Sequence, residues 1–280
     1  MKKLLAIVLC AIMMFTLCAC SSGAEEPKTY ANKLEKILDE GVLTIATSPD
    51  FAPSEFLDIS KTGQDSIVGA DISLAYYIAE ELGVELVIEA MDFTAVQAAV
   101  TQGSVDMGIS GFAATEERKE SMNLSDFYNL NTRETKGHGI IMLAENAANY
   151  TNPEDFAGLT IGAQNASLQM NLLTAQVPEA TPQPITSLDT AILEVINGKV
   201  DGLAVSWVNG ESYIANYPEL AMTNFHFDYT SDGTVIAMKK GEDELTAKVN
   251  EILEKGRNTE GLFQGWYDDA VALAESLGIN

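Results

Sequence analysis

The sequence predicts an α/β fold with largely parallel sheets. Short β-rich runs alternate with amphipathic helical segments along most of the chain, which is the pattern of this fold class. Hydrophobic residues make up 46% of the 280 positions, enough for one or two apolar cores. All three cysteines lie within the first 20 residues, so we expect the folded part to depend on its cores and to contain no disulfide.

The predicted elements follow one another at short intervals. A glycine before the first strand, another after the first helix and a Thr cap before the third helix are typical boundaries. We expect strands at residues 42–48, 84–88, 105–109, 140–143, 160–163, 202–205 and 235–238. We expect helices at residues 71–82, 94–101, 115–121, 167–173, 189–196, 242–255 and 260–277.

Two of these helices have clear sequence support. In the helix at 71–82, a 3.6-residue period places Ile72, Ala75, Tyr76 and Ala79 on one face, which we expect to be buried. In the helix at 115–121, Glu116 and its neighbouring glutamate lie near the positive end of the helix dipole.

The N-terminus reads as an export signal. A pair of lysines precedes an apolar run from Leu4 to Phe15, which is too short to span a membrane comfortably. The following Leu17-Cys18-Ala19-Cys20 resembles the lipobox of bacterial lipoproteins. This resemblance implies that residues 1–20 form a lipoprotein signal peptide and lipobox, and that Cys20 is lipidated. The alternative is an ordinary secretory signal with chance cysteines.

The next segment, residues 21–37, is predicted to be a flexible tether between the membrane and the folded body. Its first part, Ser21 to Lys28, is small, polar and contains a proline. The tether would hold the body off the membrane, and the lipobox resemblance implies that the body lies outside the cytoplasm.

The negative net charge of the chain argues against nucleic acid and anionic lipid as partners. The chain has 41 acidic and 16 basic residues, a net charge of -25, so phosphate backbones and anionic lipid would repel it. We therefore expect no nucleic-acid partner, and membrane attachment through acyl chains and not through a basic patch.

Catalytic and metal-binding patterns are also missing from the sequence. His138 and His226 are the only histidines and belong to no metal motif, and neither a GxSxG nor a GxxxxGK segment occurs. We expect no cofactor, no metal site and no enzyme activity.

Five segments resemble the extracytoplasmic solute-binding proteins of polar amino acid ABC importers (solute-binding protein family 3), and their order and spacing follow those of the family. Within the family, the resemblance is to the glutamine-binding branch. They are VLTIATSPDFAPSEF, IVGADISLAYYIAEELGVELVIEAMDF, TAVQAAVTQGSVDMGISGFAATEERKE, LTIGAQNAS and NGKVDGLAVS. The resemblance implies a two-lobed periplasmic-binding-protein fold (type II), with a ligand cleft between lobes joined by two crossing segments. Lobe one would comprise residues 38–133 and 230–280, and lobe two residues 134–229.

In lobe one, the resemblance implies that Arg118 binds the carboxylate of the ligand. A guanidinium suits this role because it donates two parallel hydrogen bonds to a carboxylate. Ser110, Gly111 and Ala113 would follow a strand beside the cleft, where the backbone N–H groups of Gly111 and Ala113 would donate to the ligand. A plain small-residue turn and a surface Arg are the alternatives.

Aromatic and lobe-two positions complete the expected site. The resemblance implies that Phe51 and Phe93 flank the ligand side chain, although both are also suited to the core. From lobe two, Gln164 and Ser167 would lie between a strand and a helix whose N-terminus attracts a carboxylate. Trp207 could line the cleft or fill the core of the lobe.

One position departs from the family pattern. Ser206 stands where the family usually has the Asp that neutralises the ligand's ammonium, and burying an ammonium without an anion is costly. Either another acid, such as Asp50 or Glu211, takes this role, or the ligand lacks an α-ammonium.

The resemblance implies a lipid-anchored, monomeric binding protein that captures a small amino-acid-like solute by hinge closure and delivers it to an ABC permease. A cyclohexadienyl-dehydratase-like enzyme and a receptor that signals without transport are the alternatives on the same fold.

Overall fold

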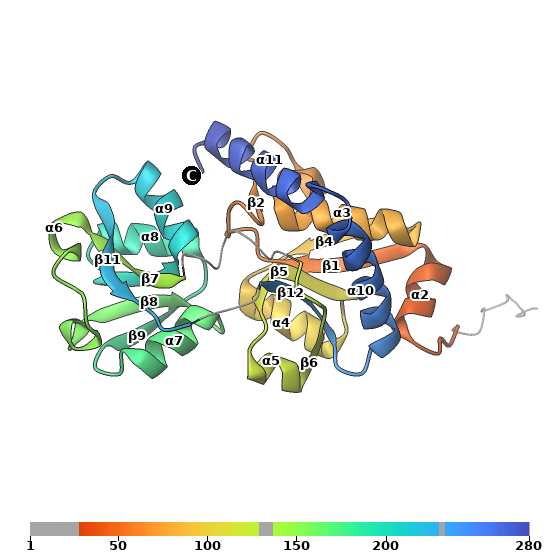
Figure 1. Ribbon diagram of the computed structural model, residues 1–280, viewed down its shortest axis with the longest axis horizontal. Coiled ribbons are helices and arrows are strands. Elements are labelled where there is room, and N and C mark those ends of the chain that lie inside the picture. The colour runs from red at the N-terminus through yellow and green to blue at the C-terminus, as the bar shows by residue number, and fades with distance from the viewer. Residues whose placement is uncertain (1–27, 129–136, 230–232, 280) are drawn as a thin grey trace, which may run out of the picture. The chain divides into compact units, whose positions relative to one another are not determined.

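The computed structural model describes residues 28–128, 137–229 and 233–279. It contains two five-stranded sheets, each flanked by helices (Figure 1). We call the described residues 33–128 and 233–279 lobe one, and residues 137–229 lobe two.

Lobe one is built on the sheet β4-β1-β5-β12-β6. Strands β4, β1 and β5 are parallel, and β12 runs antiparallel to both of its neighbours. The elements of lobe one are α2 (Lys33–Glu40), β1 (Val42–Thr47), β2 (Phe56–Leu57), β3 (Ile67–Val68), α3 (Ala70–Leu82), β4 (Glu85–Ala90), α4 (Phe93–Gln102), β5 (Met107–Ala113), α5 (Glu116–Ser121), β6 (Met122–Leu124), β12 (Thr234–Lys239), α10 (Asp243–Arg257) and α11 (Leu262–Leu277).

Lobe two is built on the sheet β11-β7-β10-β8-β9. Strands β10, β8 and β9 are parallel, and β7 runs antiparallel to β10 and β11. The elements of lobe two are β7 (His138–Leu143), α6 (Ala144–Ala147), β8 (Thr160–Gln164), α7 (Leu168–Gln176), β9 (Thr181–Ile185), α8 (Leu188–Ile196), β10 (Gly202–Ser206), α9 (Trp207–Asn216) and β11 (Leu220–His226).

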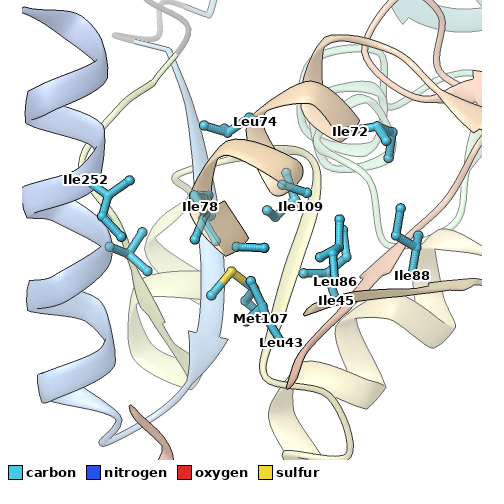
Figure 2. Packing of buried hydrophobic residues seen from close by; sticks show 14 of the residues in the cluster. Leu43, Ile45, Ile72, Leu74, Ile78, Leu86, Ile88, Met107, Ile109 and Ile252 are labelled. Atoms are coloured by element: carbon cyan, nitrogen blue, oxygen red, sulfur yellow. The ribbon is translucent and has the colours of Figure 1, made fainter. Parts of the chain in front are cut away.

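The core of lobe one lies on both faces of its sheet. Leu43 and Ile45 of β1 point to the face covered by α3 and α10, where they join Ile78 and Ile252 (Figure 2). Ala46, the residue after Ile45, belongs to a separate cluster under α4. This alternation follows from the two-residue period of a strand. The sheet is therefore a middle layer with helices on both sides.

Lobe two repeats this layering. Leu203 and Val205 of β10 pack in the cluster that contains α8, whereas Ala204 packs in the cluster that contains α7. Since the strands are buried on both faces, they read in the sequence as continuous apolar runs. The α/β fold class expected from the sequence is confirmed.

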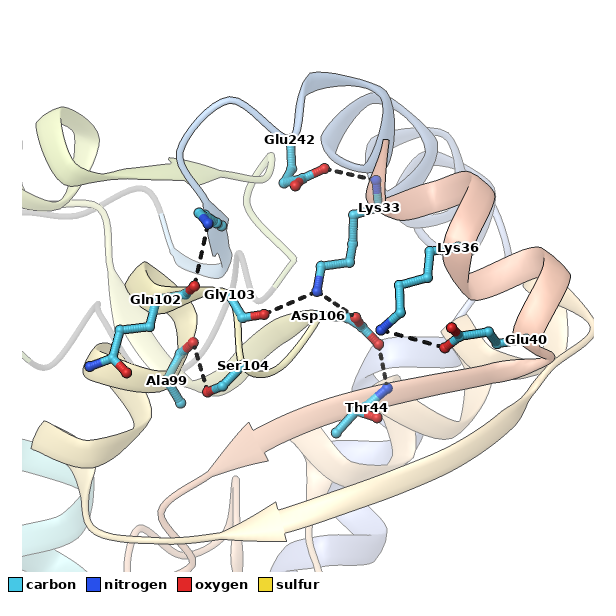
Figure 3. A network of polar contacts seen from close by, with 11 residues as sticks. Lys33, Lys36, Glu40, Thr44, Ala99, Gln102, Gly103, Ser104, Asp106 and Glu242 are labelled. Atoms are coloured by element: carbon cyan, nitrogen blue, oxygen red, sulfur yellow. Dashed lines mark hydrogen bonds and ion pairs between the residues drawn. The ribbon is translucent and has the colours of Figure 1, made fainter. Parts of the chain in front are cut away.

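Helix α2 corrects the predicted tether, because residues 33–37 are helical and not part of a flexible segment. Asn32 caps the helix by accepting from Glu35 N–H at 2.9 Å. Lys33 ties the helix to lobe one (Figure 3): its Nζ lies 3.2 Å from Asp106 Oδ1 and its backbone N–H donates to Glu242. Asp106 also accepts from Thr44 N–H at 2.8 Å, so one buried carboxylate connects α2 with β1.

Some element predictions were wrong in part. The sheets are mixed, because β6, β7, β11 and β12 make antiparallel pairs. Tyr76, expected on the buried face of α3, is 45% exposed. Strand β5 continues to Ala113, four residues beyond the predicted end.

Several predictions lie outside the described residues. These are the signal peptide at 1–20 with Cys20, the start of the tether, and the lobe boundary at 133/134; the boundary at 229/230 falls at the edge of a described segment. In the described part of the chain, no helix is both long and apolar enough to cross a membrane.

Candidate ligand-binding cleft

A cavity between the two lobes collects the predicted site. All nine residues predicted to bind ligand line it: Phe51, Phe93, Ser110, Gly111, Ala113, Arg118, Gln164, Ser167 and Ser206. Asp50, named from the sequence as a candidate counter-ion, lines it as well. The described lining residues that were not predicted are Ser48, Glu55, His138, Leu168, Gln169 and Thr234. We call this cavity the cleft.

Arg118 is the main electrostatic feature of the cleft. Its side chain projects from α5, which begins after the Thr115 cap as the sequence predicted. The residue is only 5% exposed, and its guanidinium donates to Ala113 O at 2.9 Å, Ala166 O at 3.1 Å and Gln97 Oε1 at 3.4 Å. All three acceptors are neutral, and no described carboxylate lies within ion-pair distance of Arg118. Burial lowers the pKa of Arg118 to about 10, so the group is still charged at neutral pH.

Aromatic rings surround this cation. The Arg118 Cζ lies 5.2 Å from the centroid of Phe93 and 5.1 Å from that of Phe112. These are cation–π distances, so the rings orient the guanidinium without neutralising it. Phe93 thus has a contact that the sequence did not indicate.

Ala166, in the turn between β8 and α7, has an unusual backbone conformation. The backbone of Ala166 has φ +56°, a left-handed conformation that costs a non-glycine residue about 1–2 kcal/mol. In this conformation its carbonyl accepts from both Arg118 and Gln97 Nε2 across the lobes.

Strand β5 holds the other lobe-one groups, and here one expectation was wrong. Gly111 N–H donates to Asp71 Oδ2 at 2.9 Å, so it is not available to a ligand in this structure. Gly111 has φ +55°, and a Cβ there would lie 3.0 Å from the Phe51 ring. Gly111 therefore serves close packing of Phe51. Ser110 Oγ accepts from Ser48 N–H at 3.0 Å and donates to Glu55 Oε1 at 3.1 Å.

Asp50 links the lobes at one end of the cleft. Its carboxylate accepts from Leu188 N–H at 2.9 Å and from Gln164 Nε2 at 3.2 Å, both in lobe two, and from Ser48 Oγ. Burial is the largest effect on this carboxyl and raises its pKa, against the opposing effect of these hydrogen bonds. Phe51, the next residue, packs against the core of lobe two.

Ser167 and Ser206 are helix caps as well as cleft residues. Ser167 Oγ accepts from Met170 N–H at the start of α7, and Ser206 Oγ accepts from Asn209 N–H at the start of α9. Ser206 Oγ also donates to the Asn209 side chain. The Ser206 hydroxyl is thus engaged as both donor and acceptor, whereas the Ser167 hydroxyl accepts from Met170 and its O–H could still donate to a ligand.

Two other candidates from the sequence lie outside the cleft. Glu211, the second candidate counter-ion, is exposed on α9 and is not among the residues that line the cleft. Trp207 stacks on His226 with centroids 4.2 Å apart and does not line the cleft either.

Glu55, which is 1% exposed, does line the cleft. Glu55 forms a backbone bridge with the predicted Phe51, which brings it to the same cavity.

His138, a histidine that belongs to no metal motif, also lines the cleft. It pairs with Ser206 across the β7–β10 ladder, and Gln169 Nε2 lies 3.2 Å from its Nδ1. Burial lowers the pKa of His138 to about 4, so the ring is neutral at pH 7.

The formal charges of the cleft all belong to lobe one. Among the described lining residues these are Arg118, Asp50 and Glu55, whereas lobe two contributes only neutral groups. A ligand would therefore meet its charged partners on one wall of the cleft.

Comparisons with known proteins agree with this architecture. The signature of "Bacterial extracellular solute-binding proteins, family 3" matches residues 43–268. The chain belongs to this family. It is 28% identical to the arginine-binding extracellular protein ArtP of Bacillus subtilis, over 95% of this chain and 98% of that protein. It is 27% identical to a "Probable histidine-binding protein" of Campylobacter jejuni, over 97% and 98%.

A solved structure is also similar. The amino acid ABC transporter substrate-binding protein AbpA of Streptococcus pneumoniae, bound to L-arginine, superimposes with a TM-score of 0.78 at 30% identity, covering 88% of this chain and 99% of that one. The two-lobed binding-protein fold expected from the sequence is confirmed.

The buried His138 makes stability depend on pH. The unfolded chain binds a proton at His138 near the ordinary pKa of 6.5, whereas the folded chain does so only near 4. Stability therefore decreases as pH falls from about 6.5 to about 4. We predict that His138→Gln loses less unfolding free energy than the wild type between pH 7 and pH 5, measured by urea unfolding. Equal losses in both proteins would contradict the burial of a neutral His138.

Proposed function

We propose that this protein is the binding component of an ABC importer and that its ligand is a cationic amino acid, with L-arginine the first candidate. The observation that carries the proposal is the buried guanidinium of Arg118, whose acceptors among the described residues are all neutral.

A charged group in this position needs an anion. Removing a cation from water costs several kcal/mol unless an opposite charge compensates it, and the cation–π contacts and carbonyls around Arg118 compensate only in part. A ligand carboxylate would supply the missing charge through two parallel hydrogen bonds. This supports a ligand that carries a carboxylate.

The charge balance of the cleft favours a ligand with a net positive charge. By formal charge, Asp50 and Glu55 together outweigh Arg118 by one negative charge, and His138 is neutral. Arginine, with one carboxylate and two cationic groups, would bring the total to zero, whereas a neutral amino acid would leave one negative charge buried. The similarity to an arginine-binding relative and to an arginine-bound structure supports the same choice.

In this proposal, lobe one performs the task of the Asp that Ser206 replaces. Asp50 and Glu55 are the carboxylates near the cleft wall that carries Arg118, so a ligand ammonium would be neutralised there. Lobe two would then select the ligand with neutral groups, His138 and Gln169 among them. An α-amino acid remains compatible with the Ser206 substitution.

Hinge closure is the proposed mechanism. Hydrogen bonds cross between the lobes at both ends of the cleft, from Asp50 at one end and Arg118 at the other, and the free space left is about 50 Å³. This volume is enough for a few waters and too small for an amino acid. The lobes would part to admit the ligand and close over it, and contacts made only in the closed form would favour closure. A permease would then receive the ligand from the closed form.

We also propose that Cys20 carries a lipid that anchors the protein outside the cytoplasm. The lipobox-like residues 17–20 and the acidic net charge support acyl chains over a basic patch. The named relatives are binding proteins, which supports binding without catalysis.

Titration calorimetry of the purified protein with L-arginine tests the ligand assignment. We predict that Arg118→Lys weakens arginine binding at least about tenfold, because an ammonium cannot form the paired hydrogen bonds of a guanidinium. Arg257→Lys is the matched control, because Arg257 lies on α10 and bonds to Phe127 O. Citrulline, the neutral analogue of arginine, should also bind at least about tenfold more weakly. Equal affinity of the two variants would remove Arg118 from the site.

The anchor has its own test. We predict that Cys20→Ser moves the protein from the membrane fraction to the soluble fraction and abolishes incorporation of a labelled fatty acid, because the lipid attaches to this thiol. Cys18→Ser, two residues away, serves as the control and should stay with the membrane. Membrane attachment of Cys20→Ser would argue against the lipoprotein assignment.

A further inference from the structure

A second cavity lies between the lobes and is distinct from the cleft. Its free volume is about 290 Å³, close to the size of small-molecule sites. Its walls come from residues 49–59 of lobe one, from α8 and α9 of lobe two, and from Gly278 and Ile279 at the end of the chain. Asp50 lines both cavities, and Asn209 Nδ2 donates to Ala52 O between them at 2.9 Å.

The wall of this cavity combines acidic, aromatic and apolar groups. Asp50 and Asp189 supply two carboxylates, and Tyr213 and Tyr217 supply rings. The described lining residues include no Lys, Arg or His. Apolar side chains complete the wall: Ala52, Phe56, Leu57, Ile59, Ile192 and Ile279. Such a wall complements a molecule with a positive charge and a short hydrocarbon part.

The two carboxylates repel each other across the cavity. No hydrogen bond or ion pair joins the Asp189 carboxylate to another described residue, and Asp189 as a whole residue is exposed to solvent. Burial and, after it, the charge of Asp50 raise the pKa of Asp189 to about 6. The pKa of the Tyr213 hydroxyl is raised by burial and then by both aspartates, so this hydroxyl stays neutral. A bound cation would relieve the repulsion.

A metal ion fits this cavity less well than an organic cation. A hard metal ion needs six or more oxygen ligands, and the described residues contain no group of three or more acidic, His or Cys side chains arranged to hold one. The aromatic and apolar wall instead offers cation–π and hydrocarbon contacts.

We propose that this cavity is a second binding site, separate from the cleft, for a small organic cation of the alkylammonium or alkylguanidinium class. Both lobes form its walls, so an occupant binds only when the lobes are in contact. The site therefore favours the same arrangement of the lobes that a cleft ligand would favour.

Butylammonium is the probe, titrated into the purified protein at pH 7 by calorimetry. We expect binding at millimolar concentrations or below, and a loss of at least about tenfold for Asp189→Asn, which removes a single charge. Asp228→Asn is the matched control, since Asp228 is exposed and does not line the cavity. This control should bind as the wild type does.

Two further measurements test whether the site binds the positive charge of the probe. 1-Butanol, which has the same hydrocarbon part without the charge, should bind at least about tenfold more weakly than butylammonium. At pH 6, binding should release protons, because a cation lowers the pKa of Asp189; the heat then varies with the ionisation enthalpy of the buffer. Absence of binding to the wild type, or equal binding by Asp189→Asn, would overturn the proposal.

Discussion

The buried charge of Arg118 is the constraint on which the site depends. Three elements accept hydrogen bonds from its guanidinium: the end of β5 through Ala113 O, α4 through Gln97, and the β8–α7 turn through Ala166 O. The first two lie in lobe one and the third in lobe two, so the guanidinium is also a contact between the lobes. Its charge nevertheless has no described anionic partner. A ligand carboxylate would complete the site. The strained backbone of Ala166 belongs to the same site, because its carbonyl accepts from Arg118.

Asp50 plays the complementary part at the other end of the cleft. It belongs to lobe one, but two of its hydrogen-bond partners, Leu188 N–H and Gln164 Nε2, belong to lobe two. Because Asp50 and Arg118 project from the same lobe, the charges stay together whether the lobes are apart or in contact. The neutral wall of lobe two then closes over a ligand without bringing another charge into the cleft. This division of charge differs from the family pattern, in which an Asp at the position of Ser206 would act from lobe two.

Family motifs predicted more of the site than local patterns did. All nine predicted residues line one cavity because motif order reflects how strand ends meet in the fold. The motifs could not predict the hydrogen-bond partners of these residues. The donation of Gly111 N–H to Asp71, for example, joins residues 40 positions apart in the sequence. Glu55 and His138 were missed for the same reason, since a carboxylate or imidazole in a sequence carries no sign of the cavity it faces.

The fold shows the same limit. Strong signals such as the Thr115 cap and the glycine after α3 placed elements correctly. Helix α2 was missed because its eight polar-rich residues are held by tertiary contacts of Lys33 with Asp106 and Glu242. The antiparallel strands were missed because alternation of strands and helices does not specify how a returning segment, such as β12, enters a sheet.

The most direct test of the account is a crystal structure of the protein grown with L-arginine. The account predicts electron density for the amino acid in the cleft, with both carboxylate oxygens within about 3 Å of guanidinium nitrogens of Arg118. It also predicts the cationic groups of the ligand on the side of Asp50 and Glu55. An empty cleft at saturating arginine, or a bound arginine whose carboxylate lies away from Arg118, would contradict the central claim that the ligand supplies the missing anion.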